Sequence, residues 1–359
     1  MAVSFAEISR RAFLRCAACT AAAAALPRLA PSMPTPTRII LDTDPGVDDA
    51  MAIFLALRSP ELKVEAITAV SGNVPLSLTL PNALRLVEIA GRGDVPVAAG
   101  AATPLVRRLV TAKYAHGNNG LGGVEFPEPK LKPVAETAVE LISRMVHANP
   151  GEITIVAVGP LTNVATALIS DPSLASKIQS ILVMGGSLNG GNITPAAEFN
   201  FYVDPEAARI VFDSGVPLTM VGLNVTNRVL MRDEQIRILE AAHNPVSQAA
   251  GKIMRATLDR WMRDRQLTGF GMHDPVTVAH LVDPTILTLK DYYVQIETTG
   301  ELTAGESVAF SRAPRTSPPM NTGLPAPDSP DAEFKPNCKV AVEADADKFF
   351  RLLLSRLTA

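Results

Sequence analysis

The sequence lacks several features on which whole classes of protein depend. Its 359 residues include one tryptophan and four tyrosines, and its formal net charge is −3 with a pI near 6.0. A chain without a basic excess has no electrostatic footprint for a nucleic acid polymer, and so few aromatic rings make a poor stacking platform for single strands. We therefore expect any nucleotide-like ligand to be a small molecule.

Cysteine and long apolar runs are also scarce. Cys16 and Cys19 lie in a segment that we expect to be removed, so the mature chain would keep only Cys338 and no internal disulfide. Beyond that segment, no stretch reaches the roughly 18 to 20 apolar residues that a membrane span needs. We therefore expect no stable membrane span.

Residues 1–33 are interpreted as an export signal with a short linker. Arg10 and Arg11 belong to the run S-R-R-A-F-L-R, which resembles the twin-arginine signal, and an apolar run with five consecutive alanines follows. A basic amphipathic helix is the alternative. We expect an exported protein, periplasmic or secreted, whose one domain covers residues 34–359.

Short β-rich runs alternate with helical ones from residue 38 onward, which is typical of a mostly parallel sheet covered by helices on both faces. Strands are predicted at 39–41, 64–70, 95–98, 153–158, 181–184 and 218–221, and helices at 47–57, 80–90, 135–147, 161–169, 205–212, 233–243 and 245–265. We expect a doubly wound α/β fold. A (β/α)₈ barrel is the weaker alternative because the lengths between strands are irregular.

The C-terminal part has a different pattern. Strands are predicted at 292–298, 307–312 and 338–342, with a loop rich in proline and serine at 313–336 and a final helix at 345–357. We expect these strands to add an antiparallel edge to the main sheet. The Pro-rich loop is interpreted as an insertion without chemistry of its own.

Four carboxylates lie within eight residues, where a predicted strand turns into a helix: Asp42, Asp44, Asp48 and Asp49. Like charges about 4 Å apart cost on the order of 4 kcal/mol at an effective dielectric near 20. A hard cation with oxygen ligands would relieve that repulsion. The alternative is helix capping with Asp44 as the N-cap, although capping alone needs only one or two acids.

Polar segments follow most of the predicted strands. They are residues 42–49, 71–73, 159–163, 185–200 and 222–224. In open α/β sheets, ligands bind in a crevice at the carboxyl ends of the strands. We therefore expect these segments to converge on one site.

Six separated motifs carry a family resemblance. They are D-T-D-P-G-V-D-D-A (42–50), A-V-S-G-N (69–73), V-G-P-L-T-N (158–163), V-M-G-G (183–186), A-E-F-N-F-Y-V-D-P-E-A-A (197–208) and M-H-D-P (272–275). The pattern resembles the inosine-uridine-preferring nucleoside hydrolases, from about residue 38 to the final helix. The resemblance implies a Ca²⁺-dependent enzyme that cleaves the N-glycosidic bond of ribonucleosides to ribose and free base, and a homo-oligomer, either a dimer or a tetramer.

The resemblance also implies a metal site. Ca²⁺ would be held by Asp44, Asp49, Asp274 and the backbone carbonyl of Val158, a set of hard oxygen ligands. Asp44 would also take a proton from the attacking water, and Asp42 would orient the other acids as a supporting residue.

Recognition of ribose is implied for five polar residues: Asp48, Asn73, Asn192, Glu198 and Asn200. Glu198 and Asn200 are predicted to share one face of an extended segment. Ordinary turn chemistry is the alternative for Asn73 and Asn192. A site built for hydroxyl groups should discriminate against 2′-deoxyribonucleosides.

Three more residues are implied at the base. His273 would donate a proton to the departing base, His116 would assist from a glycine-rich loop, and Met184 would line the pocket. Without the resemblance, these would be a structural His-Asp pair, a surface loop and a core methionine. The segment 267–271 lacks the tyrosine-rich stretch of some members, which leaves the base preference open.

Two other functions compete with this prediction. The D-x-D of Asp42 and Asp44 could belong to a phosphatase with an aspartyl nucleophile, although Pro45 and the two further acids do not suit it. A non-catalytic nucleoside-binding protein on the same fold is the second alternative.

Overall fold

A computed structural model describes residues 35–311 and 335–359, and the part from residue 36 onward forms one compact unit. The predicted export signal at 1–33 and nearly all of the Pro-rich loop at 313–336 lie outside the described residues. Among the described helices, none is long and apolar enough to cross a membrane.

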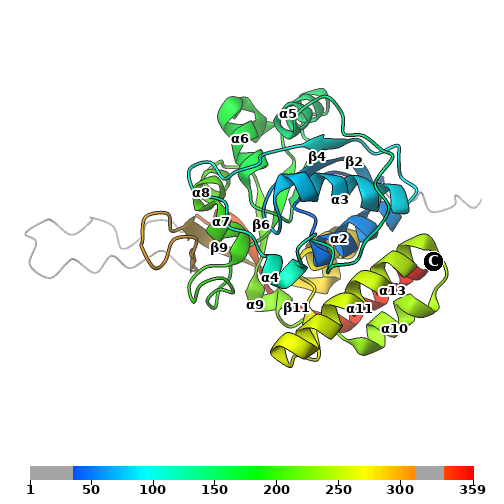
Figure 1. The fold of residues 1–359 in the computed structure, drawn as a ribbon. Helices are drawn as coiled ribbons and strands as arrows, with labels where there is room; N and C mark the ends of the chain where they lie inside the picture. Colours follow the sequence, from blue (N-terminus) through cyan, green and yellow to red (C-terminus); the bar gives the residue numbers. More distant parts are fainter. Residues whose placement is uncertain (1–34, 312–334) are drawn as a thin grey trace, which may run out of the picture. The chain divides into compact units, whose positions relative to one another are not determined.

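A nine-stranded sheet forms the centre of the domain, in the order β10-β9-β11-β6-β5-β4-β1-β2-β3 (Figure 1). Its strands are β1 (Thr37–Thr43), β2 (Leu62–Ala69), β3 (Val97–Ala99), β4 (Ile153–Ala157), β5 (Ser180–Met184), β6 (Leu218–Val221), β9 (Leu287–Ile296), β10 (Ser307–Phe310) and β11 (Cys338–Ala344). Strands β1 to β6 are all parallel to their neighbours. The predicted α/β fold with a mostly parallel sheet is confirmed.

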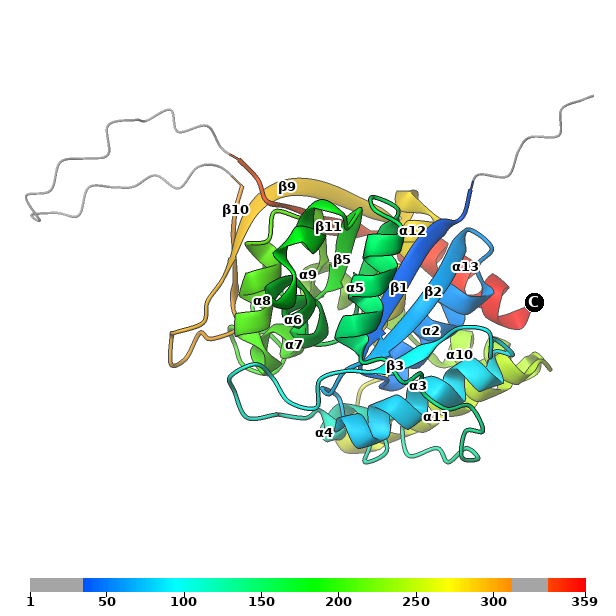
Figure 2. The same cartoon turned by 90° about the horizontal axis from the view of Figure 1, so that it is seen from above.

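Helices cover both faces because the buried strands are apolar on both sides. In β1, Ile39 and Leu41 point into one core and Ile40 points into the other. The first core packs under α2 (Val47–Arg58), α3 (Leu76–Ile89), α10 (Asp233–Ala241), α11 (Pro245–Arg265), α12 (His273–Val282) and α13 (Ala346–Thr358), and the second under α5 (Ala138–Ala148), α6 (Thr162–Ser170) and α8 (Pro205–Phe212) (Figure 2). The sheet is therefore doubly wound.

The C-terminal edge is antiparallel as predicted, with one difference. β9 pairs antiparallel with both β10 and β11, but β11 itself runs parallel to β6. β9 also begins at Leu287 rather than at residue 292.

Several short elements were not predicted. They are α4 (Lys113–His116), α7 (Phe199–Val203), α9 (Leu223–Thr226), the ribbon of β7 (Leu230–Met231) and β8 (Phe270–Gly271), the 3₁₀ turns at Pro172–Ser176 and Pro284–Ile286, and α12. One-turn helices are too short to show a helical period. The helix α12 was missed because its valines and threonine favour strands when read in isolation.

The strand order explains where the site lies. β1 lies between β2 and β4. The chain winds outward from β1 through β2 to β3, and from β4 in the opposite direction through β5 to β6. Loops that leave β1 and β4 therefore separate and open a crevice at the topological switch point. The acidic turn after β1 and the segment after β4 form its two sides.

The helix α2 should be the most sensitive part of this frame, because it buries every residue from Val47 to Leu57. Phe54 is 0% exposed, so Phe54→Ala should lower the free energy of unfolding by about 3 to 5 kcal/mol. Ile169→Ala, at a side chain that is 54% exposed, should change it by less than about 0.5 kcal/mol. Denaturant unfolding measures both, and equal effects would contradict this packing.

Candidate active site

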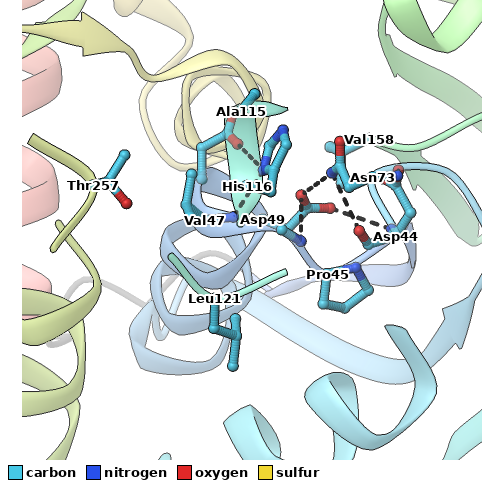
Figure 3. Close-up of polar contacts among 12 residues, drawn as sticks. Asp44, Pro45, Val47, Asp49, Asn73, Ala115, His116, Leu121, Val158 and Thr257 are labelled. Carbon is cyan, nitrogen blue, oxygen red and sulfur yellow. Dashed lines mark hydrogen bonds and ion pairs between the residues drawn. The ribbon is translucent and has the colours of Figure 1, made fainter. Parts of the chain in front are cut away.

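The acidic turn is built around Asp49. One oxygen of this carboxylate accepts from Thr43 Oγ1 (2.6 Å), and the other accepts from the Gly46 backbone N–H (2.9 Å) and from Asn73 Nδ2 (2.9 Å) (Figure 3). Gly46 is the N-cap of α2, so Asp44 does not cap the helix as the alternative interpretation proposed. A side chain at Gly46 would overlap Asn73 and His116, which explains why a glycine stands there.

Asp44 lies in the crevice with one oxygen unsatisfied. Its Oδ2 accepts from the Asn73 backbone N–H (2.6 Å), whereas its Oδ1 is buried and has no hydrogen-bond partner among the described residues. Gly72 and Gly159 pack so closely against this carboxylate that a side chain at either position would collide with it. A buried, unpartnered carboxylate oxygen is left open to a proton or to a ligand, and Asp44 Oδ1 lies among other acids, where a cation would be favoured.

The charges of the cluster support that conclusion. Burial, followed by the negative charges of neighbouring acids, raises the pKa of Asp44 and of Asp274 well above the usual range. Burial and the charge of Asp49 raise the pKa of Asp48 to about 7. The donors are all hard oxygens, so the site fits a hard divalent cation.

Another group of possible ligands is Asp48, Asp49 and His116, whose ligand atoms lie within 4.8 Å of one another. The Nδ1 atom of His116, however, accepts the backbone N–H of Val47 (3.1 Å) (Figure 3). Its lone pair is therefore occupied. In this arrangement the carboxylates of Asp48 and Asp49 remain as possible oxygen ligands without His116.

Asp42 lies behind the other acids. Its Oδ1 accepts from Thr68 Oγ1 (2.5 Å) and from Asn163 Nδ2 (2.7 Å), and burial raises its pKa to about 7. Asn163 in turn accepts the backbone N–H of Ala101 (2.8 Å). Asp42 thus joins β1, β2 and α6 below the site and does not line the cavity.

Asn200 and Glu198 are arranged differently from the prediction. Glu198 is the N-cap of α7 and accepts from the backbone N–H groups of Asn200 (2.8 Å), Phe201 (3.1 Å) and Gly186 (3.0 Å), so the segment turns into a helix after Glu198 and the predicted extended run is wrong. The segment was misread because a capped helix of five residues shows no helical period. Burial raises the pKa of Glu198 to about 7.

The amide of Asn200 connects two strand ends. Its Nδ2 donates to the carbonyls of Val158 (2.9 Å) and Met184 (3.1 Å). The predicted metal ligand Val158 O therefore already accepts one hydrogen bond, and its second lone pair remains. Asn192 accepts the Phe199 backbone N–H through Oδ1 (2.9 Å), which leaves its amide nitrogen for other partners.

Both predicted histidines reach the site as neutral side chains. Burial lowers the pKa of His273 to about 4, and its Nδ1 lies 2.8 Å from Thr226 Oγ1. Burial, and then repulsion from the protonated form of His273 and from Arg260, lower the pKa of His116 to about 3. Thr226 is a partner that the sequence did not reveal, because α9 is a single turn far from His273 in the chain.

One cavity of about 340 Å³ joins these groups, a size that suits a small-molecule ligand. Of the predicted site residues, its walls include Asp48, Asn73, His116, Val158, Met184, Asn192, Glu198, Asn200, His273 and Asp274. Asp44 and Asp49 are fully buried and do not line it. The prediction missed the outer walls Tyr114, Asn227, Leu230, Trp261, Arg265 and Phe270. The single tryptophan of the sequence was the one signal available for them.

The fold and the acidic crevice define a class of protein, and sequence comparison names it. The chain belongs to the family described as "Inosine-uridine preferring nucleoside hydrolase", whose model matches residues 39–351. It is therefore an N-glycosidase that hydrolyses ribonucleosides.

Individual relatives are similar over almost the whole chain. The pyrimidine-specific ribonucleoside hydrolases RihA of Citrobacter koseri and of Escherichia coli O9:H4 are each 44% identical, with 89% of this chain and 97% of the relative covered. A plant nucleoside hydrolase, PpNRh1, has a TM-score of 0.81 at 36% identity, covering 90% of this chain and 100% of that structure. The purine-preferring ribonucleoside hydrolase of Gardnerella vaginalis has a TM-score of 0.78 at 30% identity, covering 89% and 98%.

The raised carboxyl pKa values predict how stability depends on pH without a cation. A carboxyl whose pKa is higher in the folded state stabilises fully below its unfolded pKa, and this contribution is lost as the pH rises through the folded pKa. For Asp48 that folded value is about 7, and Asp44 and Asp274 are also raised. The buried histidines oppose this trend near pH 6.5, because they take up protons there only in the unfolded state, so the carboxyls should dominate between pH 7 and 8.

In chelator, the free energy of unfolding should therefore fall from pH 7 to 8, by up to about 1.4 kcal/mol per pH unit for each carboxyl that remains protonated. Urea denaturation at a series of pH values measures this slope. A divalent cation that binds these acids should reduce it. A slope of zero or of opposite sign in chelator would show that the pKa values of these carboxyls are not raised in the folded state.

Proposed function

We propose that the protein is a Ca²⁺-dependent ribonucleoside hydrolase that prefers pyrimidine ribonucleosides. The observation that carries the Ca²⁺ dependence is the buried, unpartnered Asp44 Oδ1 among acids whose pKa values are raised. The pyrimidine preference rests on the relatives with 42 to 44% identity, which are named pyrimidine-specific. The purine-preferring structure is less similar, at 30%.

The proposed ligands of the cation are the carboxylates of Asp44, Asp49 and Asp274 and the carbonyl of Val158. All are oxygen donors, the type that Ca²⁺ selects. When bound, the cation would neutralise the acids and lower the pKa of a nearby water. It would also keep these carboxylates ionised at neutral pH.

The substrate's ribose would lie against the polar side of the cavity. Asp48, Asn73, Asn192 and Asn200 line that cavity and offer both donors and acceptors to hydroxyl groups. Asp44, freed of its proton, would accept one from the attacking water. Because a buried polar group without its partner is costly, a missing 2′-hydroxyl should weaken binding.

His273 is the proposed donor to the departing base. When Thr226 donates to Nδ1, the neutral imidazole carries its hydrogen on Nε2, which can then donate to the base. A neutral donor suits a site that already holds several negative charges. His116 has the same tautomer for the same reason, because Val47 N–H occupies its Nδ1.

We also propose that the enzyme acts outside the cytoplasm as a homo-oligomer, a dimer or a tetramer. Export is supported by the twin arginines at residues 10 and 11, and the oligomer by family resemblance. Nucleoside salvage would then take place in the periplasm or the medium.

A panel of ribonucleosides tests the proposed activity. Uridine and cytidine should release ribose faster than inosine, 2′-deoxyuridine should react poorly, and a Ca²⁺ chelator should abolish release until Ca²⁺ is restored. Asp44→Asn should lower kcat by about 10² to 10⁴ fold. The amide keeps the shape of the carboxylate but cannot act as a base and is a weaker metal ligand. Release of phosphate from nucleoside monophosphates, with no ribose from nucleosides, would favour a phosphatase and sink the proposal.

The role of His273 has its own test. His273→Ala should lower kcat for uridine by about 10² fold or more, since an unprotonated base is a poor leaving group. An aryl riboside with an acidic phenol as leaving group should lose far less. Equal losses for both substrates would show that His273 acts by position and not as a proton donor.

A further inference from the structure

The helix α4 brings Tyr114 and His116 to the cavity although it has no anchor of its own. It is one turn long, none of its four residues is buried, and Gly117 ends it in a left-handed conformation (φ 77°). A single turn is not stable in isolation, because nucleation costs more than one hydrogen bond returns. Its position must therefore come from its neighbours.

At the start of α4, the N-cap Ala112 donates to the carbonyl of Asn73 (3.0 Å) and packs with Phe199 and Val203. Two arginines of α11 hold the other end of α4. The Nη2 atom of Arg260 donates to the backbone carbonyl of Ala115, next to His116. The guanidinium of Arg265 lies over the rings of Tyr114 (5.4 Å to the centroid) and Trp261 (5.0 Å). Trp261 and Arg265 are four residues apart and share one face of α11. Both of them line the cavity, as does Tyr114.

The glycine-rich loop after α4 returns to the same helix. The Gly122 N–H donates to the carbonyl of His116 (2.8 Å), and Gly122 packs against Thr257 and Ile253 of α11. The backbone before His116 is therefore hydrogen-bonded to α11, and the loop bonded to its carbonyl passes close to the same helix. The imidazole of His116 also accepts the backbone N–H of Val47 at the start of α2.

Arg260 differs from the other arginine contacts of α11. Arg255 pairs with Asp233 (2.7 Å) and Glu240 (2.9 Å), which joins α10 to α11. Within the described chain, Arg260 has no such carboxylate partner, its Nε is buried without a hydrogen bond, and burial lowers its pKa. Asp264 is the acid whose charge acts on Arg260, but the two form no ion pair. A half-buried cation without an ion pair contributes little to stability, so its contact with Ala115 points to a role at the site.

We infer that Arg260 and Arg265 are positioning residues that clasp α4 to α11. Arg260 fixes the backbone that carries His116, and Arg265 braces Tyr114 and Trp261 as walls of the cavity. The inference rests on the proposed contact of His116 with substrate. Loss of the clasp should weaken substrate binding more than it slows the chemical step, because the acidic cluster is untouched.

Arginine variants of the full-length protein test the clasp. With uridine, Arg260→Met and Arg265→Met should each raise KM by about tenfold and lower kcat by less than about threefold. Hydrogen exchange over residues 113–123 should become faster in both. Arg260→Lys should restore most of the affinity, since one donor suffices for Ala115, whereas Arg265→Lys should not, since stacking needs the planar guanidinium.

Arg255→Met is the matched control on the same helix. It removes two ion pairs far from α4 and should lower Tm while KM and exchange over 113–123 stay as in the wild type. Wild-type KM and exchange in Arg260→Met and Arg265→Met would overturn the clasp, and faster exchange with unchanged KM would overturn its role in binding. If the wild type releases no ribose, the proposed function fails, and exchange alone still decides whether the clasp exists.

Discussion

The structure depends on one electrostatic constraint, which is that several carboxylates are buried together at the end of β1. Burial and the charges of neighbouring acids, Asp49 among them, raise the pKa values of Asp44, Asp48 and Asp274, and the backbone N–H groups and hydroxyls around the cluster satisfy only part of its oxygens. Like charges in a desolvated site need either protons or a cation. The raised pKa values mean that, without a cation, some of these carboxyls keep their protons. In the functional state, we propose that a bound Ca²⁺ replaces those protons.

The fold serves this constraint by bringing distant segments to one sheet edge. β1 and β4 diverge at the switch point, glycines let backbones approach the carboxylate of Asp44, and the start of α12 adds Asp274 and His273. Neutral histidines complete the site without adding positive charge. Residues of α4 line the cavity, and this helix contacts Arg260 and Arg265 of α11.

Most of this arrangement could be predicted from the sequence, because it depends on local patterns. Apolar runs predicted the parallel strands, and polar residues after each strand predicted a common crevice; ten of the predicted site residues line it. What failed depends on contacts between distant residues. The capping role of Asp49, the helical turn after Glu198, the pairing of Thr226 with His273 and the clasp at Ala115 leave no periodic signal in the chain.

Direct Ca²⁺ binding is the measurement closest to the central claim. A calorimetric titration of chelator-stripped protein at pH 7, repeated in buffers of different ionisation enthalpy, gives both the number of ions and the protons released. The account predicts about one ion per chain, with proton release because raised carboxyls ionise on binding, and much weaker binding in Asp274→Asn. No saturable binding, or binding that Asp274→Asn leaves unchanged, would contradict it.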